Sequence, residues 1–80
     1  MNIDEIRAFL KNILIDIGIE EEFLNDMKSV TTVELGLKSV ELIDMAVSIK
    51  EKYGVSMKLT VKEDITLEDI CEYILENVNK

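Results

Sequence analysis

Apolar side chains recur along the first part of the chain at steps of three and four residues, the spacing of one face of an α-helix. They predict a first helix within residues 2–19, with an apolar face made of Ile3, Ile6, Leu10, Ile13 and Ile17. Asn2 is placed to cap this helix, with Glu5 three residues later, and Gly18 is placed to end it.

The same spacing predicts two further long helices. One spans residues 39–54, ends at Gly54, and turns inward a stripe made of Leu42, Met45, Ala46, Ile49 and Tyr53. The other spans residues 65–78, is capped by Thr66, and turns inward a stripe made of Leu67, Ile70, Cys71, Ile74 and Val78.

Two shorter features complete the expected fold. Thr60 and Glu63 stand in a capping-box relation, which predicts a short third helix at residues 59–64. Residues 18–38 form a long connection with a helical turn or two in "EEEFLND", pinned to the core by Phe23, Leu24, Val30, Val33, Leu35 and Leu37. The predicted fold is therefore all-α, a small four-helix bundle of three longer helices and one short helix. The 80 residues suit a single domain, residues 1–80.

Charge and composition narrow the classes of partner. Seventeen acids face nine bases, giving a formal net charge of −8. Such a surface repels nucleic acid and anionic membranes and attracts a basic protein, although acidity also serves simply to keep a small domain in solution. A cytoplasmic location is predicted from the lone Cys71, from the lack of an apolar run of about 18 residues and from an N-terminus unlike a signal peptide. We expect a monomer, although no sequence feature fixes the oligomeric state.

The chain is poor in catalytic groups, and we expect no enzyme activity. It has no histidine, and Lys38 and Ser39 are sequence neighbours that cannot face each other as a Ser–Lys dyad must. The stretch "DITLED" lacks the glycine and the ligand spacing of a calcium loop, and no glycine-rich phosphate loop is present. Cys71 lies on an apolar stripe and is expected to be an inert core thiol.

The predicted second helix carries a second stripe that faces away from the core. It consists of Val40, Asp44, Val47 and Glu51, and this alternation of apolar and acidic residues is typical of a face that serves a partner. Ser39 lies at the start of the helix, shortly after Gly36. A serine there is expected to act as an N-cap, unless its hydroxyl carries a modification.

The stretch "ELGLKSVELIDMAVSIKEKYGV" resembles the signature of acyl carrier proteins, in which a leucine–glycine pair precedes a serine at the start of the second helix. The order of helices, the acidity and the scarcity of aromatic residues are similar over the whole chain. The resemblance implies a covalent 4′-phosphopantetheine on Ser39, attached by a phosphopantetheinyl transferase. The arm would hold acyl groups as thioesters for acyl-transferring or synthase enzymes. It also implies a bundle whose interior admits an acyl chain.

By the same resemblance, the second helix is the docking surface, with partner-binding residues at Lys38, Val40, Glu41, Asp44, Val47 and Glu51. Lys38 and Val40 depart from the acidic residue and the leucine that usually flank the serine. These departures favour a specialised pathway as much as fatty acid synthesis, with polyketide, lipid, and aminoacyl or peptidyl carriers as alternatives. A carrier-like helical domain that only binds proteins, without the arm, is a further hypothesis.

Overall fold

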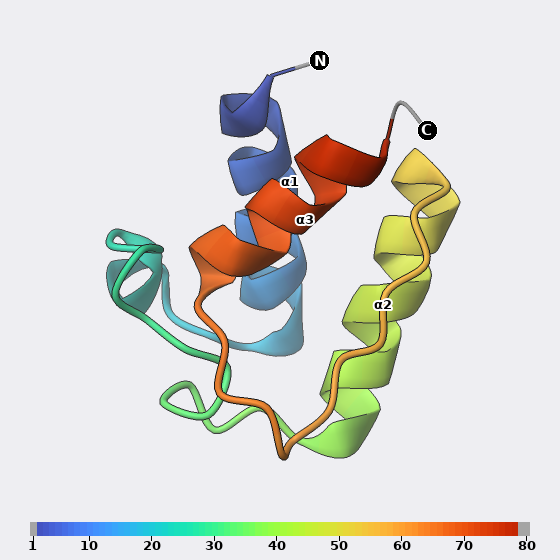
Figure 1. The fold of residues 1–80 in the computed structure, drawn as a ribbon. Helices are drawn as coiled ribbons and strands as arrows, with labels where there is room; N and C mark the ends of the chain where they lie inside the picture. Colours follow the sequence, from blue (N-terminus) through green and yellow to red (C-terminus); the bar gives the residue numbers. More distant parts are fainter. Residues whose placement is uncertain (1, 79–80) are drawn as a thin grey trace.

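Three long α-helices form where the apolar spacing predicts them, which confirms an all-α chain. The computed structural model describes residues 2–78, which fold into α1 (Ile3–Ile17), the 3₁₀ helix η1 (Glu21–Leu24), α2 (Ser39–Tyr53) and α3 (Leu67–Asn77) (Figure 1). Within these residues there is no β-strand; Thr31 and Thr66 form an isolated antiparallel bridge. None of the helices in this described part is long and apolar enough to cross a bilayer.

The ends of α1 follow the predicted caps. The side chain of Asn2 accepts a hydrogen bond from the backbone N–H of Glu5 at 3.0 Å. At the other end the backbone N–H of Gly18 donates to the carbonyls of Leu14 and Ile15, at a φ of +121° that side chains with a Cβ rarely adopt. Both contacts satisfy backbone groups that a helix end leaves without a partner.

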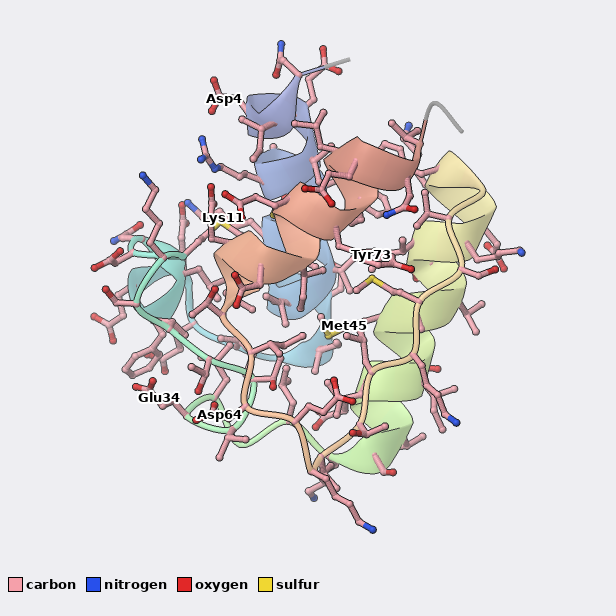
Figure 2. All side chains as sticks on the ribbon, viewed as in Figure 1. Asp4, Lys11, Glu34, Met45, Asp64 and Tyr73 are labelled. Atoms are coloured by element: carbon pink, nitrogen blue, oxygen red, sulfur yellow. The ribbon has the colours of Figure 1, made fainter. Side chains whose placement is uncertain are left out.

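The helices enclose one aliphatic core. In Figure 1, α2 runs opposite to α1, and α3 crosses α1. Figure 2 shows side chains from all three helices filling the space between them. The fully buried residues are Ile6, Leu10, Leu14, Leu24, Leu42, Met45, Ile49, Leu67, Ile70, Cys71 and Ile74. Most of them belong to the predicted stripes; Leu14 and Leu24 were not part of a predicted helix face.

The long connection between α1 and α2 is tied to the start of α3. The backbone N–H groups of Leu67 and Glu68 donate to the carbonyls of Val30 and Met27, each at 3.0 Å. The connection thus satisfies N–H groups in the first turn of α3 that have no partner within the helix.

Side chains of the connection pack less completely than predicted. Leu24 and Leu37 are buried, and Val30 and Leu35 pack partly against the core. Phe23 and Val33 were also expected to pin the connection, but they are 55% and 52% exposed, so that part of the prediction is wrong.

The short third helix predicted at residues 59–64 does not form, so the bundle has three α-helices and not four within residues 2–78. Only a turn is present, in which the N–H of Glu63 approaches the carbonyl of Thr60 at 3.4 Å. The physical reason lies in the pattern of residues 56–62, where Met57, Leu59 and Val61 alternate with polar side chains. A two-residue period suits an extended chain more than a helix. Tyr73 holds the start of this segment in place by donating its hydroxyl to the carbonyl of Ser56 at 3.3 Å.

A partly buried ion pair joins the first and last helices. Arg7 of α1 donates Nε to Glu68 Oε1 at 2.9 Å and Nη2 to Glu68 Oε2, while Nη1 donates to Asp4. The Glu68 side chain is 9% exposed, and the hydrogen bonds from Arg7 lower the pKa of its carboxyl. Glu68 lies in the first turn of α3, and its carboxylate bridges this helix to α1.

Candidate functional site

A tight turn at residues 33–36 precedes α2 and forms the start of the site. Gly36 adopts a φ of +68°, in the left-handed region where glycine carries no steric penalty, and its N–H donates to the carbonyl of Val33 at 3.0 Å. Leu37 follows and is buried. The turn and the buried leucine fix the position from which Lys38 and Ser39 start the helix.

Ser39 does not act as the N-cap of α2, which was one of the two roles considered for it, because the helix begins one residue earlier than a serine cap requires. Lys38 occupies the cap position, with φ −85° and ψ 161°, and Ser39 is the first helical residue. The backbone N–H of Lys38 donates to Glu41 Oε1 at 2.8 Å, so the carboxylate of Glu41 closes the helix start. Ser39 is exposed, and its hydroxyl is not used to cap the helix.

Most residues predicted to bind partners lie on the surface of α2. Val40 is 62% exposed and Val47 is 49% exposed, and Lys38, Asp44 and Glu51 are also exposed. These positions are accessible, as a docking role requires. Glu41 differs: it is half-buried and its carboxylate is engaged with Lys38 at the helix start.

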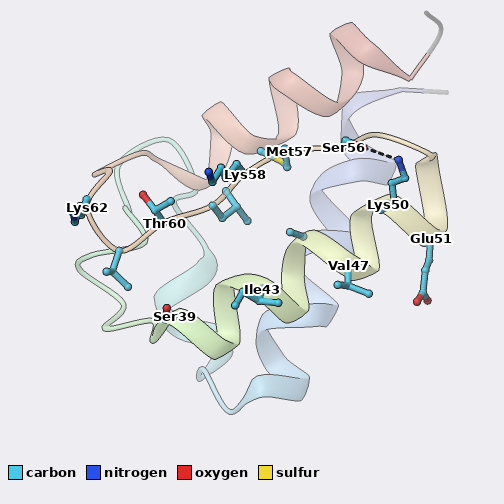
Figure 3. A pocket seen from close by; sticks show the side chains of 13 residues that line it. Ser39, Ile43, Val47, Lys50, Glu51, Ser56, Met57, Lys58, Thr60 and Lys62 are labelled. Carbon is cyan, nitrogen blue, oxygen red and sulfur yellow. Dashed lines mark hydrogen bonds between the residues drawn. The ribbon is translucent and has the colours of Figure 1, made fainter.

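An apolar groove extends from Ser39 along one side of α2. Figure 3 shows α2 as one wall, with Ser39 at one end and Lys50 and Glu51 at the other, and the non-helical segment 56–62 as the opposite wall. The groove has a volume of about 840 Å³. Its apolar lining residues are Ile43, Ala46, Val47, Met57, Leu59 and Val61.

The sequence pattern did not identify two contributors to this groove. Ile43 is 57% exposed and lies next to Val40 and Val47, where it forms an apolar ridge at the mouth of the groove. It was overlooked because it falls between the inward stripe and the outward stripe of α2. Residues 56–62 were overlooked as a wall because part of that stretch was expected to be helical. The alternation of Met57, Leu59 and Val61 was the available signal.

The side chains available for chemistry at this site are few. Within residues 2–78 no cluster of three metal-ligating side chains occurs, and the chain contains no histidine. Cys71 is fully buried on α3, and burial raises the pKa of its thiol to about 12. The thiol therefore stays protonated and does not supply a nucleophile. Ser39 contributes an exposed hydroxyl at one end of the groove, and Ser56 contributes another at the opposite end.

Comparison of the chain with protein-family models, with curated proteins and with solved structures gives no match.

Proposed function

We propose that this chain is a carrier protein that holds acyl intermediates as thioesters on a 4′-phosphopantetheine arm attached to Ser39. The observation that carries the proposal is the exposed Ser39 hydroxyl at the first residue of α2, beside an apolar ridge and at the end of an apolar groove. An exposed hydroxyl is accessible to a modifying enzyme, and the groove offers an acyl chain a place away from water.

The attachment step requires a second protein. The Ser39 oxygen would attack the phosphorus of coenzyme A that bears the pantetheine. A bond from serine oxygen to phosphorus forms as the pyrophosphate bond breaks, and adenosine 3′,5′-bisphosphate leaves. The serine proton passes to a base of the phosphopantetheinyl transferase. The chain is thus proposed to be a substrate of the transferase and of acyl-transferring or synthase enzymes, and not itself an enzyme.

The apolar ridge of α2 is the proposed docking surface for these enzymes. Val40, Ile43 and Val47 are each about half exposed or more, and an apolar centre with a charged rim is the usual anatomy of a protein interface. Exposed charges beside the ridge, at Lys38, Asp44 and Glu51, would then select the partner. We propose a cytoplasmic pathway, in fatty acid synthesis or in specialised polyketide or lipid synthesis, with aminoacyl or peptidyl carriage as the alternative cargo.

A second candidate function is protein binding without the arm. The observation that favours it is the exposed ridge itself, because such a ridge can dock a partner whether or not Ser39 is modified.

Transfer of phosphopantetheine separates the two candidates. The purified protein is incubated with coenzyme A and several broad-specificity transferases, and its intact mass is measured. One added group is expected on the wild type and on Ser56→Ala, which alters an exposed serine at the other end of the groove. No addition is expected on Ser39→Ala. Failure of every transferase, or addition at another residue, would leave protein binding as the favoured function.

A further inference from the structure

A second hollow lies on the connection between α1 and α2, apart from the groove that begins at Ser39. Its apolar lining consists of Ile19, Phe23 and Leu35, and its volume is about 380 Å³. Glu34, which also lines it, lies at the left of the molecule in Figure 2, whereas α2 forms the right side. A protein that docks on this hollow would therefore contact a different face from one that docks on α2.

Phe23 exposes an aromatic ring at this hollow. Its side chain is 55% exposed, whereas the other three aromatic residues of the chain have contacts within the fold. Phe9 and Tyr53 pack edge to face with ring centroids 5.2 Å apart, and the hydroxyl of Tyr73 donates to a backbone carbonyl. An exposed ring keeps a large apolar face in water, and burying such a face is a main source of binding energy at protein interfaces.

The charged groups around the ring are carboxylates. Glu20 and Glu34 line the hollow, and no base lines it within residues 2–78. The ion pairs of this described part are made by Arg7 and Lys11, and neither Glu20 nor Glu34 takes part in them. Residues 18–36 contain five acids and one base, so the surroundings of the hollow are also negative. The charge of the hollow therefore complements a cationic group.

The two carboxylates are held on either side of the connection. Thr31 Oγ1 donates to Glu34 Oε1 at 3.3 Å and accepts from the backbone N–H of Glu34 at 3.1 Å. The backbone N–H of Phe23 donates to the carbonyl of Glu20 at 3.1 Å, which places Glu20 one turn before the ring. A carboxylate accepts hydrogen bonds at both oxygens, so Glu34 can still accept from another molecule.

We propose that this hollow binds an arginine side chain of a partner protein, with its guanidinium stacked on Phe23 and hydrogen-bonded to Glu20 and Glu34. A guanidinium is planar, stacks on aromatic rings and donates in pairs to carboxylates, which an ammonium group does less well. The aliphatic stem of arginine suits the apolar lining at Ile19 and Leu35. The inference does not rest on the carrier proposal, because it concerns another face of the molecule and needs no arm.

The direct test compares short peptides that differ in one side chain. Acetyl-Gly-Arg-Gly amide and its lysine and citrulline analogues are titrated into the unmodified protein at constant ionic strength, and amide chemical shifts are followed by nuclear magnetic resonance. We expect saturable binding of the arginine peptide, about threefold tighter than the lysine peptide and about tenfold tighter than the uncharged citrulline peptide. The largest shifts should occur in residues 18–24 and 33–36.

Matched variants separate the ring from the charge. Phe23→Leu keeps an apolar side chain without the ring, and it should weaken binding of the arginine peptide about threefold. Glu34→Gln should also weaken it about threefold, whereas Glu72→Gln, the same charge change at an exposed residue of α3, should leave it unchanged. All three positions are exposed, so the fold should persist, which circular dichroism checks.

Several results would overturn this inference. They are equal affinity for the arginine and citrulline peptides, largest shifts on α2 or α3, or an equal loss from Glu34→Gln and Glu72→Gln. Free arginine binding as tightly as the peptide would assign the hollow to a small molecule, and shifts that depend on protein concentration alone would assign it to a second copy. Ser39→Ala should bind the arginine peptide as the wild type does, so this inference and the carrier proposal can fail separately.

Discussion

The backbone N–H of Lys38 donates to the carboxylate of Glu41 at 2.8 Å, and this contact closes the start of α2. The cap residue is a lysine, which offers no side-chain acceptor for the first N–H groups of the helix. The helix start therefore keeps only the other contact of a capping box, in which the Glu41 carboxylate accepts from the backbone N–H of Lys38. Ser39 lies between these two residues, so the contact also helps to hold the serine in place.

Replacing Glu41 by Ala is expected to lower the free energy of unfolding by about 1 kcal/mol, because the helix start loses its capping contact. Glu41→Gln keeps a side-chain oxygen that can accept from Lys38 and should lose less. Chemical denaturation of the three proteins gives the comparison. Equal stability of Glu41→Ala and the wild type would show that the contact contributes nothing measurable.

The ion pair between Arg7 and Glu68 predicts a particular dependence of stability on pH. The pKa of Glu68 is lowered in the folded protein by the hydrogen bonds from Arg7. Its contribution to stability is therefore full above the pKa of an unfolded glutamate, about 4.3, and is lost as the pH falls through the lower folded value. In Arg7→Gln this contribution is absent, so the stability difference between wild type and variant should narrow from pH 7 to pH 3.

Lys52→Gln is the matched control, because it makes the same change in net charge at an exposed residue of α2. Thermal unfolding is followed at each pH for the wild type and both variants. If the curves of Arg7→Gln and the wild type stay parallel between pH 7 and pH 3, the ion pair does not couple to acid stability.

Two neighbouring residues of α2 test the orientation of the helix. Ile49 is fully buried, and Ile49→Ala should cost about 2–5 kcal/mol of stability, as removal of a core side chain does. Val47 is 49% exposed, and Val47→Ala should change stability by less than about 0.5 kcal/mol while weakening partner binding. Denaturation midpoints measure both. Similar losses for the two variants would mean that α2 presents a different face to the core.

Lys38 is expected to select among transferases. It is exposed beside Ser39, so a transferase with basic residues around its carrier site meets like charge there. Lys38→Asp should therefore increase the rate of modification by such an enzyme, mainly through apparent affinity, and the gain should shrink as salt is raised. The test is a series of rates at low and high salt. Equal rates at low salt would remove Lys38 as a selectivity element and leave the proposed role of Ser39 untouched.

The apolar period was enough to predict the three long helices and the faces that they bury. Leu42, Met45 and Ile49 were expected to face inward and are fully buried. Apolar side chains at this spacing form one face of the helix, and packing that face against the core removes it from water. The helix predicted at residues 59–64 was wrong because it was based on a capping-box pair, Thr60 and Glu63, while the two-residue alternation of Met57, Leu59 and Val61 was missed. Tyr73 holds the chain at Ser56 and Thr32 holds it at Glu63, and the local sequence does not encode these tertiary contacts.

The candidate site was predictable in its outline and not in its detail. The exposure of Val40, Asp44 and Val47 follows from their spacing on α2. The groove does not, because one of its walls comes from a segment distant in sequence from Ser39. The burial of Glu68 could not be predicted from the sequence either. Its partner Arg7 lies on another helix, and the pairing depends on how α1 and α3 cross.

The measurement that tests the central claim most directly is the intact mass of the protein purified from its native host, followed by peptide mapping. The account predicts a population that carries one phosphopantetheine group, with or without an acyl chain, on the peptide that contains Ser39. The same preparation of Ser39→Ala should have the unmodified mass. Wild-type protein found only at its unmodified mass, in cells that modify other carriers, would contradict the account.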